Sequence, residues 1–101
     1  MPRLAEPEIL AALASVSSWQ RQENEIRRLF QFKDFPAAIR FVNRIATSAE
    51  DAFHHPDIDI RWNKVRLTLT THDESGLTQK DFDLARTIDQ IFSGQSSAKS
   101  T

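Results

Sequence analysis

The sequence predicts an α+β fold in which helices pack on one face of a small antiparallel sheet. The periodic segments follow the order helix, strands, helix, strands, helix, which fits a single sheet covered by helices. The chain has 101 residues, a length that suits one domain with one modest hydrophobic core. We expect this domain to span residues 1–93 and the small, polar residues 94–101 to form a disordered tail.

Two helices are predicted in the first half of the chain. The first covers residues 6–16, with Pro7 tolerated in its first turn. The second begins after Asp34, a favourable N-cap residue, and ends before Pro56. Phe41 falls off the apolar stripe of this second helix, so we expect it to contact a partner. The stripe consists of Ile39, Val42, Ile45, Ala46, Ala49 and Phe53.

Alternation of apolar and polar residues predicts the strands. Residues 19–22 and 25–33 are expected to form a hairpin around a turn at 23–24, although Arg28 and Leu29 interrupt the alternation. The clearest strand covers residues 61–72, in which every second side chain is apolar over the central part. Its other face is rich in lysine, arginine and threonine. We expect this polar face to be solvated or to face a second subunit.

A third helix is predicted near the end of the chain. Thr78 is the expected N-cap, and Asp81 three residues later completes a variant of the capping box. Gly94 is the expected C-terminal stop. The stripe that this helix buries consists of Phe82, Ala85, Ile88, Ile91 and Phe92.

Composition narrows the classes of function. The formal net charge is −1, which argues against direct nucleic-acid binding through bulk electrostatics. The chain has no cysteine, so disulfides and thiolate metal sites are excluded. The apolar runs are too short to span a bilayer, and the N-terminus has no hydrophobic signal region. We therefore expect a cytoplasmic protein without membrane contact.

All three histidines gather around one helix end and one strand end. His54 and His55 precede Pro56, and His72 ends the predicted strand. Imidazole exchanges protons near neutral pH, so this region is the candidate for acid–base chemistry. Glu50 lies one helical turn before His54, and we expect it to hydrogen-bond that imidazole and fix its tautomer. Capping of the helix end and binding of zinc are the alternative interpretations.

Several motifs in fixed order resemble those of the pterin-4a-carbinolamine dehydratase family. They are HHP, WNKV and TTHDESGLTQKDFDLA, with FKDF and AE earlier in the chain. The resemblance extends from the first helix to about Phe92. It implies a four-stranded antiparallel sheet with three helices on one face, assembled as a homodimer or homotetramer. It also implies dehydration of 4a-hydroxytetrahydropterin to quinonoid dihydropterin, in tetrahydropterin recycling, with no metal and no other cofactor.

The resemblance also implies roles for individual residues. The active-site histidines of the family fall on His54, His55 and His72, of which we assign His54 and His72 to proton transfer and His55 mainly to pterin binding. Phe53 and Ile58 depart from the family pattern at the rim of the pocket, where a polar and an aromatic residue are common. The substrate-binding or supporting positions are Thr70, Thr71, Glu50, Trp19 and Asp81.

Two other classes of function compete with this enzyme. Some proteins that resemble the family are binding modules, either dimerisation cofactors of a transcription factor or assembly factors of a carboxylase. Such divergent members often lose part of the histidine set, whereas this chain keeps all three. A metal-dependent hydrolase is the third hypothesis. The intact histidine set favours the dehydratase.

Overall fold

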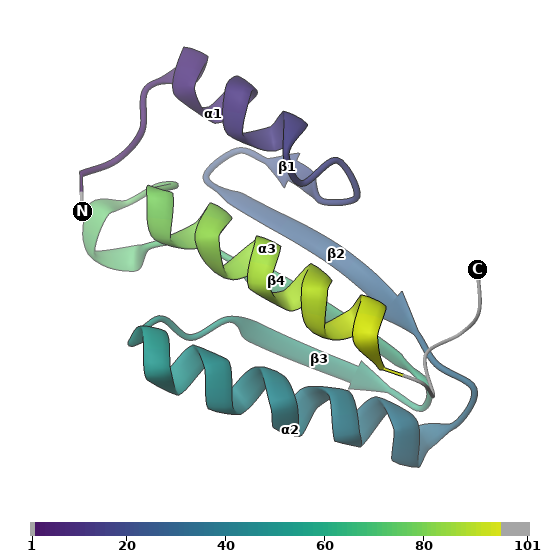
Figure 1. Cartoon of the computed structure of the whole chain (residues 1–101). Helices are drawn as coiled ribbons and strands as arrows, with labels where there is room; N and C mark the ends of the chain where they lie inside the picture. The colour runs from purple at the N-terminus through teal and green to yellow at the C-terminus, as the bar shows by residue number, and fades with distance from the viewer. Residues whose placement is uncertain (1, 96–101) are drawn as a thin grey trace.

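A computed structural model describes residues 2–95 and shows one four-stranded antiparallel sheet with three helices on one face (Figure 1). The strand order is β1-β2-β4-β3, and every neighbouring pair is antiparallel. This architecture confirms the predicted α+β class. Within residues 2–95, no helix combines the length and the apolar character needed to cross a membrane. The elements are α1 (Glu6–Ala14), β1 (Gln20–Gln22), β2 (Glu25–Gln31), α2 (Phe35–Ala52), β3 (Asp57–Arg61), β4 (Lys64–Leu69), the short 3₁₀ helix η1 (His72–Glu74) and α3 (Gln79–Gly94).

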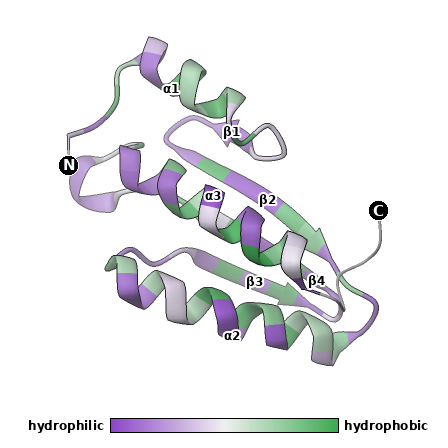
Figure 2. Cartoon of the chain, in the orientation of Figure 1, coloured by the Kyte–Doolittle hydropathy of each residue, from purple (hydrophilic) through white to green (hydrophobic). Residues whose placement is uncertain are grey.

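The core lies between the sheet and helices α2 and α3. Apolar and polar side chains alternate along β4, whereas the centre of β2 has two polar and then two apolar residues in succession, which appear as bands in Figure 2. Val65, Leu67 and Leu69 of β4 are fully buried, as their alternation predicts. A cluster of aromatic rings fills one end of the core, with ring centroids 4.9–5.9 Å apart. The cluster consists of Phe30, Phe32, Phe41 and Phe92.

Phe41 therefore packs inside the subunit and does not contact a partner as expected. The predicted apolar stripe of α2 was also wrong in part. The buried side chains of this helix are Ala37, Ala38, Phe41, Ile45 and Ala49. The small alanines beside Phe41 leave room for its large ring to pack against the sheet. These residues therefore form the buried face of the helix. Ala46 is exposed. Phe53 is 80% exposed because α2 ends before it, so the helical period no longer applies there.

The predicted strand over residues 61–72 is shorter than expected. A tight turn separates β3 from β4, with Trp62 in the left-handed region at φ 55°. Asn63 is buried in this turn and donates from its side-chain amide to the carbonyl oxygen of Phe32 at 2.7 Å. Leu69 ends β4. The strand therefore stops before His72, which instead begins η1.

Arg28 interrupts the alternation of polar and apolar residues in β2, as the sequence indicates. It lies on the helix side of the strand, where it pairs with Asp89 of α3 at 2.7 Å. Its guanidinium also lies 4.5 Å from the ring centroid of Phe30 and 5.2 Å from that of Phe92. An arginine can occupy an inward position when its charge is paired and its stem covers apolar surface.

The two ends of the fold are held by specific contacts. The Arg21 side chain of β1 pairs with Glu6 of α1, and this hydrogen bond holds the pKa of the Glu6 carboxyl below its usual value. At the other end, α3 includes Gly94, and the buried Gln95 donates from its side-chain amide to the carbonyl oxygen of Ala37 at 2.9 Å. Helix α3 thus includes the residue that was expected to stop it, and Gln95 is its C-cap. The rest of the predicted tail, 96–101, lies outside the described residues.

Candidate active site

The end of α2 places two histidines beside the sheet. Phe53 is the C-cap in a left-handed conformation, with φ 52° and ψ 40°. The backbone N–H of His54 then donates to the carbonyl oxygen of Ala49 at 3.1 Å, which satisfies a free carbonyl of the last turn. Pro56 cannot extend the helix. As predicted, His54 and His55 lie where the helix unwinds.

The end of β4 brings the third histidine to the same place. After Leu69 the chain forms an isolated bridge between Thr71 and Gly76, and η1 closes the loop between them. His72 is the first residue of η1 and is exposed. A tight loop held by a backbone bridge restricts where this imidazole can lie.

A hollow of about 240 Å³ joins these segments. It is walled by the end of α2, the end of β4 with the start of η1, and the start of α3. The structure therefore brings together all three histidines and both threonines that the sequence singled out. The lining residues are Phe53, His54, His55, Thr70, Thr71, His72, Asp73 and Lys80.

His54 is held by a buried carboxylate. This histidine is 8% exposed, and its Nε2 lies 2.5 Å from Oδ1 of Asp81, a residue with no exposed surface. Oδ2 of Asp81 accepts hydrogen bonds from the Thr71 hydroxyl and from the Thr78 backbone N–H, both at 2.9 Å. Because the Asp81 carboxylate is held by these contacts and can only accept, it fixes the orientation of the His54 ring and favours the tautomer protonated on Nε2.

Two hydroxyl groups extend this network in a defined direction. Thr71 and Thr78 have hydroxyl oxygens 2.9 Å apart. A threonine hydroxyl has one proton, and that of Thr71 is donated to Asp81. Thr78 must therefore donate to Thr71, while its oxygen accepts from the backbone N–H of Lys80 at 3.3 Å. The start of α3 and the end of β4 are thus joined through Asp81.

His55 has a different partner and a different environment. Its Nε2 lies 2.9 Å from Oε1 of Glu50, and both side chains are largely exposed. The expectation that Glu50 would bond to His54 is wrong, because the left-handed Phe53 turns the chain and shifts the contact to the next residue. Asp81 takes the role expected of Glu50, in addition to its predicted place in the capping box.

Trp19 is the predicted site residue that the structure does not bring to this hollow. It is buried in the core, and its indole N–H donates to Asp89 of α3 at 2.8 Å. Sequence reasoning missed Lys80 and Asp73, which do line the hollow. Their only signal was proximity in the chain to Asp81 and to His72, respectively. Within residues 2–95, no group of three or more His, Cys, Asp or Glu side chains is placed to hold a metal ion.

The fold and the site define a small α+β protein with a histidine-lined hollow at one end of its sheet. The sequence profile of the family described as pterin 4 alpha carbinolamine dehydratase matches residues 2–91. The chain belongs to this family.

Individual relatives agree over nearly the whole chain. A protein of Roseiflexus sp. (strain RS-1), provisionally named pterin-4-alpha-carbinolamine dehydratase, is 61% identical over 89 residues, covering 88% of this chain and 96% of the relative. The crystal structure of a transcriptional coactivator/pterin dehydratase from Brucella melitensis is 40% identical with a TM-score of 0.85, covering 88% and 97%.

A more distant structure shares the fold alone. It is a pterin dehydratase-like protein described as a RuBisCO assembly factor in the alpha-carboxysome. It is 22% identical with a TM-score of 0.62, and the match covers 77% of this chain and 89% of that one.

Proposed function

We propose that this protein dehydrates 4a-hydroxytetrahydropterin to quinonoid dihydropterin by histidine acid–base catalysis, in the recycling of tetrahydropterin in the cytoplasm. The observation that supports this proposal is the hollow in which His54, His55 and His72 meet from two separate segments of the chain. Membership of the dehydratase family adds the substrate class. We further propose that the active form is a homodimer or homotetramer.

The reaction needs two proton movements. The C–O bond at C4a breaks, and the hydroxyl leaves as water only if it receives a proton. The lone pair of the neighbouring ring nitrogen forms the new C=N bond, and that nitrogen loses its proton. Side chains that titrate near neutral pH can supply one proton and take up the other. The net reaction releases one water molecule and needs no oxidant or reductant.

His54 suits one of these proton transfers. With Nε2 engaged by Asp81 at 2.5 Å, Nδ1 is the ring nitrogen left for proton exchange. Asp81 also stabilises the imidazolium that forms when His54 accepts a proton. We assign the second transfer to His72, which reaches the hollow from a separate segment, the start of η1. The exposed His55, held by Glu50, is assigned mainly to substrate binding.

Steady-state kinetics of dehydration with single variants tests these roles. His54→Ala and His72→Ala should each lower kcat by about 10²- to 10⁴-fold, the usual contribution of one general acid or base. His55→Ala should mainly raise KM and thereby serves as the matched control for loss of an imidazole. Circular dichroism checks that each variant remains folded.

Several outcomes would contradict the proposal. Near-normal kcat in either His54→Ala or His72→Ala removes that residue from proton transfer, and near-normal kcat in both removes the mechanism. We also expect activity to survive exhaustive chelation, because no thiolate is present and adjacent histidines converge poorly on one ion. A loss that added zinc restores would favour the metal-dependent hydrolase.

Protein binding is the second candidate function. It is supported by the Brucella relative, which is described as a transcriptional coactivator as well as a pterin dehydratase and is 40% identical to this chain. The same assay separates the two candidates. A folded wild-type protein without dehydratase activity would leave the binding module as the better proposal.

A further inference from the structure

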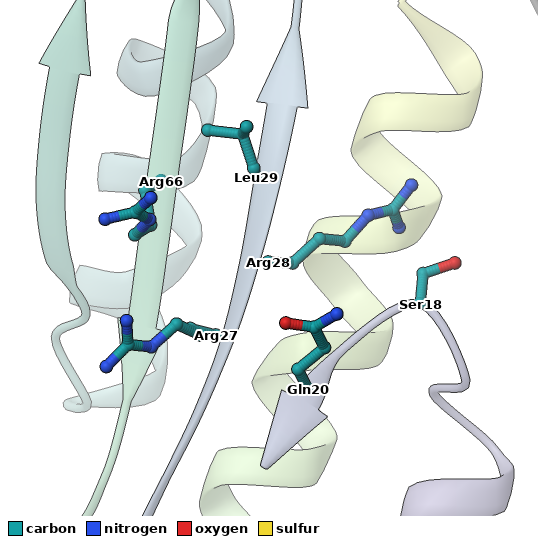
Figure 3. Close-up of a pocket in the computed structure, with 6 residues that line it drawn as sticks. All are labelled: Ser18, Gln20, Arg27, Arg28, Leu29 and Arg66. Atoms are coloured by element: carbon teal, nitrogen blue, oxygen red, sulfur yellow. The ribbon is translucent and has the colours of Figure 1, made fainter. Parts of the chain in front are cut away.

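The face of the sheet opposite the helices carries a second, larger hollow. Its volume is about 610 Å³, within the range of about 300–1,000 Å³ that is typical of small-molecule sites. Among residues 2–95, it shares no lining residue with the histidine hollow, and no carboxylate lines it. Figure 3 shows the lining side chains, which are Ser18, Gln20, Arg27, Arg28, Leu29 and Arg66.

Strand register places two of these arginines on the same side of the sheet. Arg27 of β2 is opposite Thr68 of β4, and Leu29 is opposite Arg66. Residues opposite one another in an antiparallel pair point to the same face, so Arg27 and Arg66 are diagonal neighbours, with backbones about 7–8 Å apart. Both side chains lie on the same side of β4 (Figure 3). Two long guanidinium side chains at this spacing can approach one bound group.

The three arginines differ in whether a carboxylate neutralises their guanidinium group. Arg28 extends to the other side of β2, where Asp89 neutralises it. Arg27 is bound by Glu25 through one terminal nitrogen at 3.1 Å, and its Nε has no hydrogen-bond partner. Arg66 is exposed and lies opposite Asp59 of β3, whose carboxylate pairs with Arg61 at 3.4 Å. Among residues 2–95, Arg66 itself makes no ion pair or side-chain hydrogen bond. Arg27 and Arg66 therefore keep donors that the described part of the chain does not use.

We propose that this hollow binds a small phosphomonoester, with its phosphoryl group between Arg27 and Arg66. A phosphomonoester carries a charge of about −1.5 to −2 at pH 7, which matches two guanidinium groups better than a single carboxylate does. Guanidinium also offers paired donors that fit phosphate oxygens. The Ser18 hydroxyl and the Gln20 amide provide further polar groups, and Leu29 provides apolar surface for the organic part.

Isothermal titration of the whole protein with phenyl phosphate tests this site. We expect one binding event, which Arg66→Gln and Arg27→Gln should each weaken by about tenfold or more. Arg44→Gln is the matched control, because it removes the same charge from an exposed position on α2, on the other side of the sheet. Binding should also weaken as the pH falls below about 6, where the phosphoryl group becomes a monoanion.

Two further ligands identify the chemistry that is recognised. Inorganic phosphate should bind at the same residues but more weakly than phenyl phosphate, because it lacks a part that contacts Leu29. Benzoate, an aromatic monoanion, should bind at least tenfold more weakly. Equal affinity for benzoate and phenyl phosphate would overturn the proposal, as would equal losses in Arg44→Gln and Arg66→Gln, or no binding at millimolar concentration. Unchanged dehydration kinetics in the arginine variants provides the folding control.

Discussion

The buried contact between His54 and Asp81 is the residue-scale feature on which the proposed chemistry depends most. Oδ1 of Asp81 accepts from the ring of His54, and Oδ2 accepts from Thr71 and Thr78. A buried carboxylate is stable only with such partners, and each partner is in turn oriented by it. The pair therefore sets both the position and the tautomer of the imidazole.

Replacing Asp81 with asparagine should lower kcat by about 10²- to 10⁴-fold with little change in KM. The oxygen of the asparagine amide still accepts the hydrogen bonds that cap α3. Its NH₂ group, however, donates towards Nε2 of His54, so this nitrogen has to act as an acceptor. The proton of the His54 ring therefore moves to the other nitrogen, and the tautomer reverses. Steady-state dehydration kinetics measures the effect. Asp51→Asn, an exposed change in the last turn of α2, is the control and should leave kcat unaltered. A normal kcat in Asp81→Asn would limit Asp81 to capping.

The sequence could predict which histidines gather at the candidate site but not which side chains form hydrogen bonds with them. The spacing between Glu50 and His54 suggests that their side chains are one helical turn apart. Such a contact forms only if the helix continues as far as His54. Because Phe53 adopts a left-handed conformation, the contact passes to His55. Asp81 is 27 residues from His54, and no local pattern could join them before the fold was known.

At the scale of elements, the N-terminus of α2 offers a test that leaves the site intact. The side chain of Asp34 accepts from the backbone N–H of Ala37 at 2.9 Å. Loss of an N-cap of this kind typically costs about 0.5–2 kcal/mol. The histidines lie at the opposite end of this 18-residue helix, so the cap and the chemistry are separable.

Asp34→Ala should therefore lower the free energy of unfolding by about 0.5–2 kcal/mol without changing kcat. Urea denaturation followed by circular dichroism gives the first quantity, and the dehydration assay gives the second. Asp51→Ala removes a carboxylate from the C-terminal turn of the same helix, where negative charge is unfavourable. It should be neutral or slightly stabilising. Equal losses from the two variants would show that the cap contributes nothing specific.

Elements were easier to predict than their boundaries. Alternation identified β4 because its inward side chains are all apolar, whereas the turn between β3 and β4 has no glycine or proline to mark it. Trp62 adopts the left-handed conformation there, which residue type does not predict. The stripe of α2 was displaced because Ala37, Ala38 and Phe41 belong to its buried face, whereas the predicted Ala46 is exposed.

At the scale of the whole molecule, exposed apolar side chains gather along one edge of the sheet. Ile58 and Ile60 of β3 and Trp62 in the following turn are all exposed. The two isoleucines face the helix side, opposite Leu67 and Val65 of β4. Within residues 2–95, β3 has a neighbouring strand on one side only, so the other side of its backbone can pair with another strand. Burial of Phe41 removes one reason to expect self-association, and this edge supplies another.

We predict that the protein is at least a dimer in solution and that Ile60→Lys shifts it towards monomer. A second subunit would cover apolar surface and pair the free edge of β3, and a lysine on the edge opposes both. Multi-angle light scattering at micromolar concentration measures the mass. Leu10→Lys is the control, because Leu10 is also exposed but lies on α1, beside the opposite edge of the sheet. A monomeric wild type would contradict the prediction, and a dimer that survives Ile60→Lys but not Leu10→Lys would assign the interface to α1.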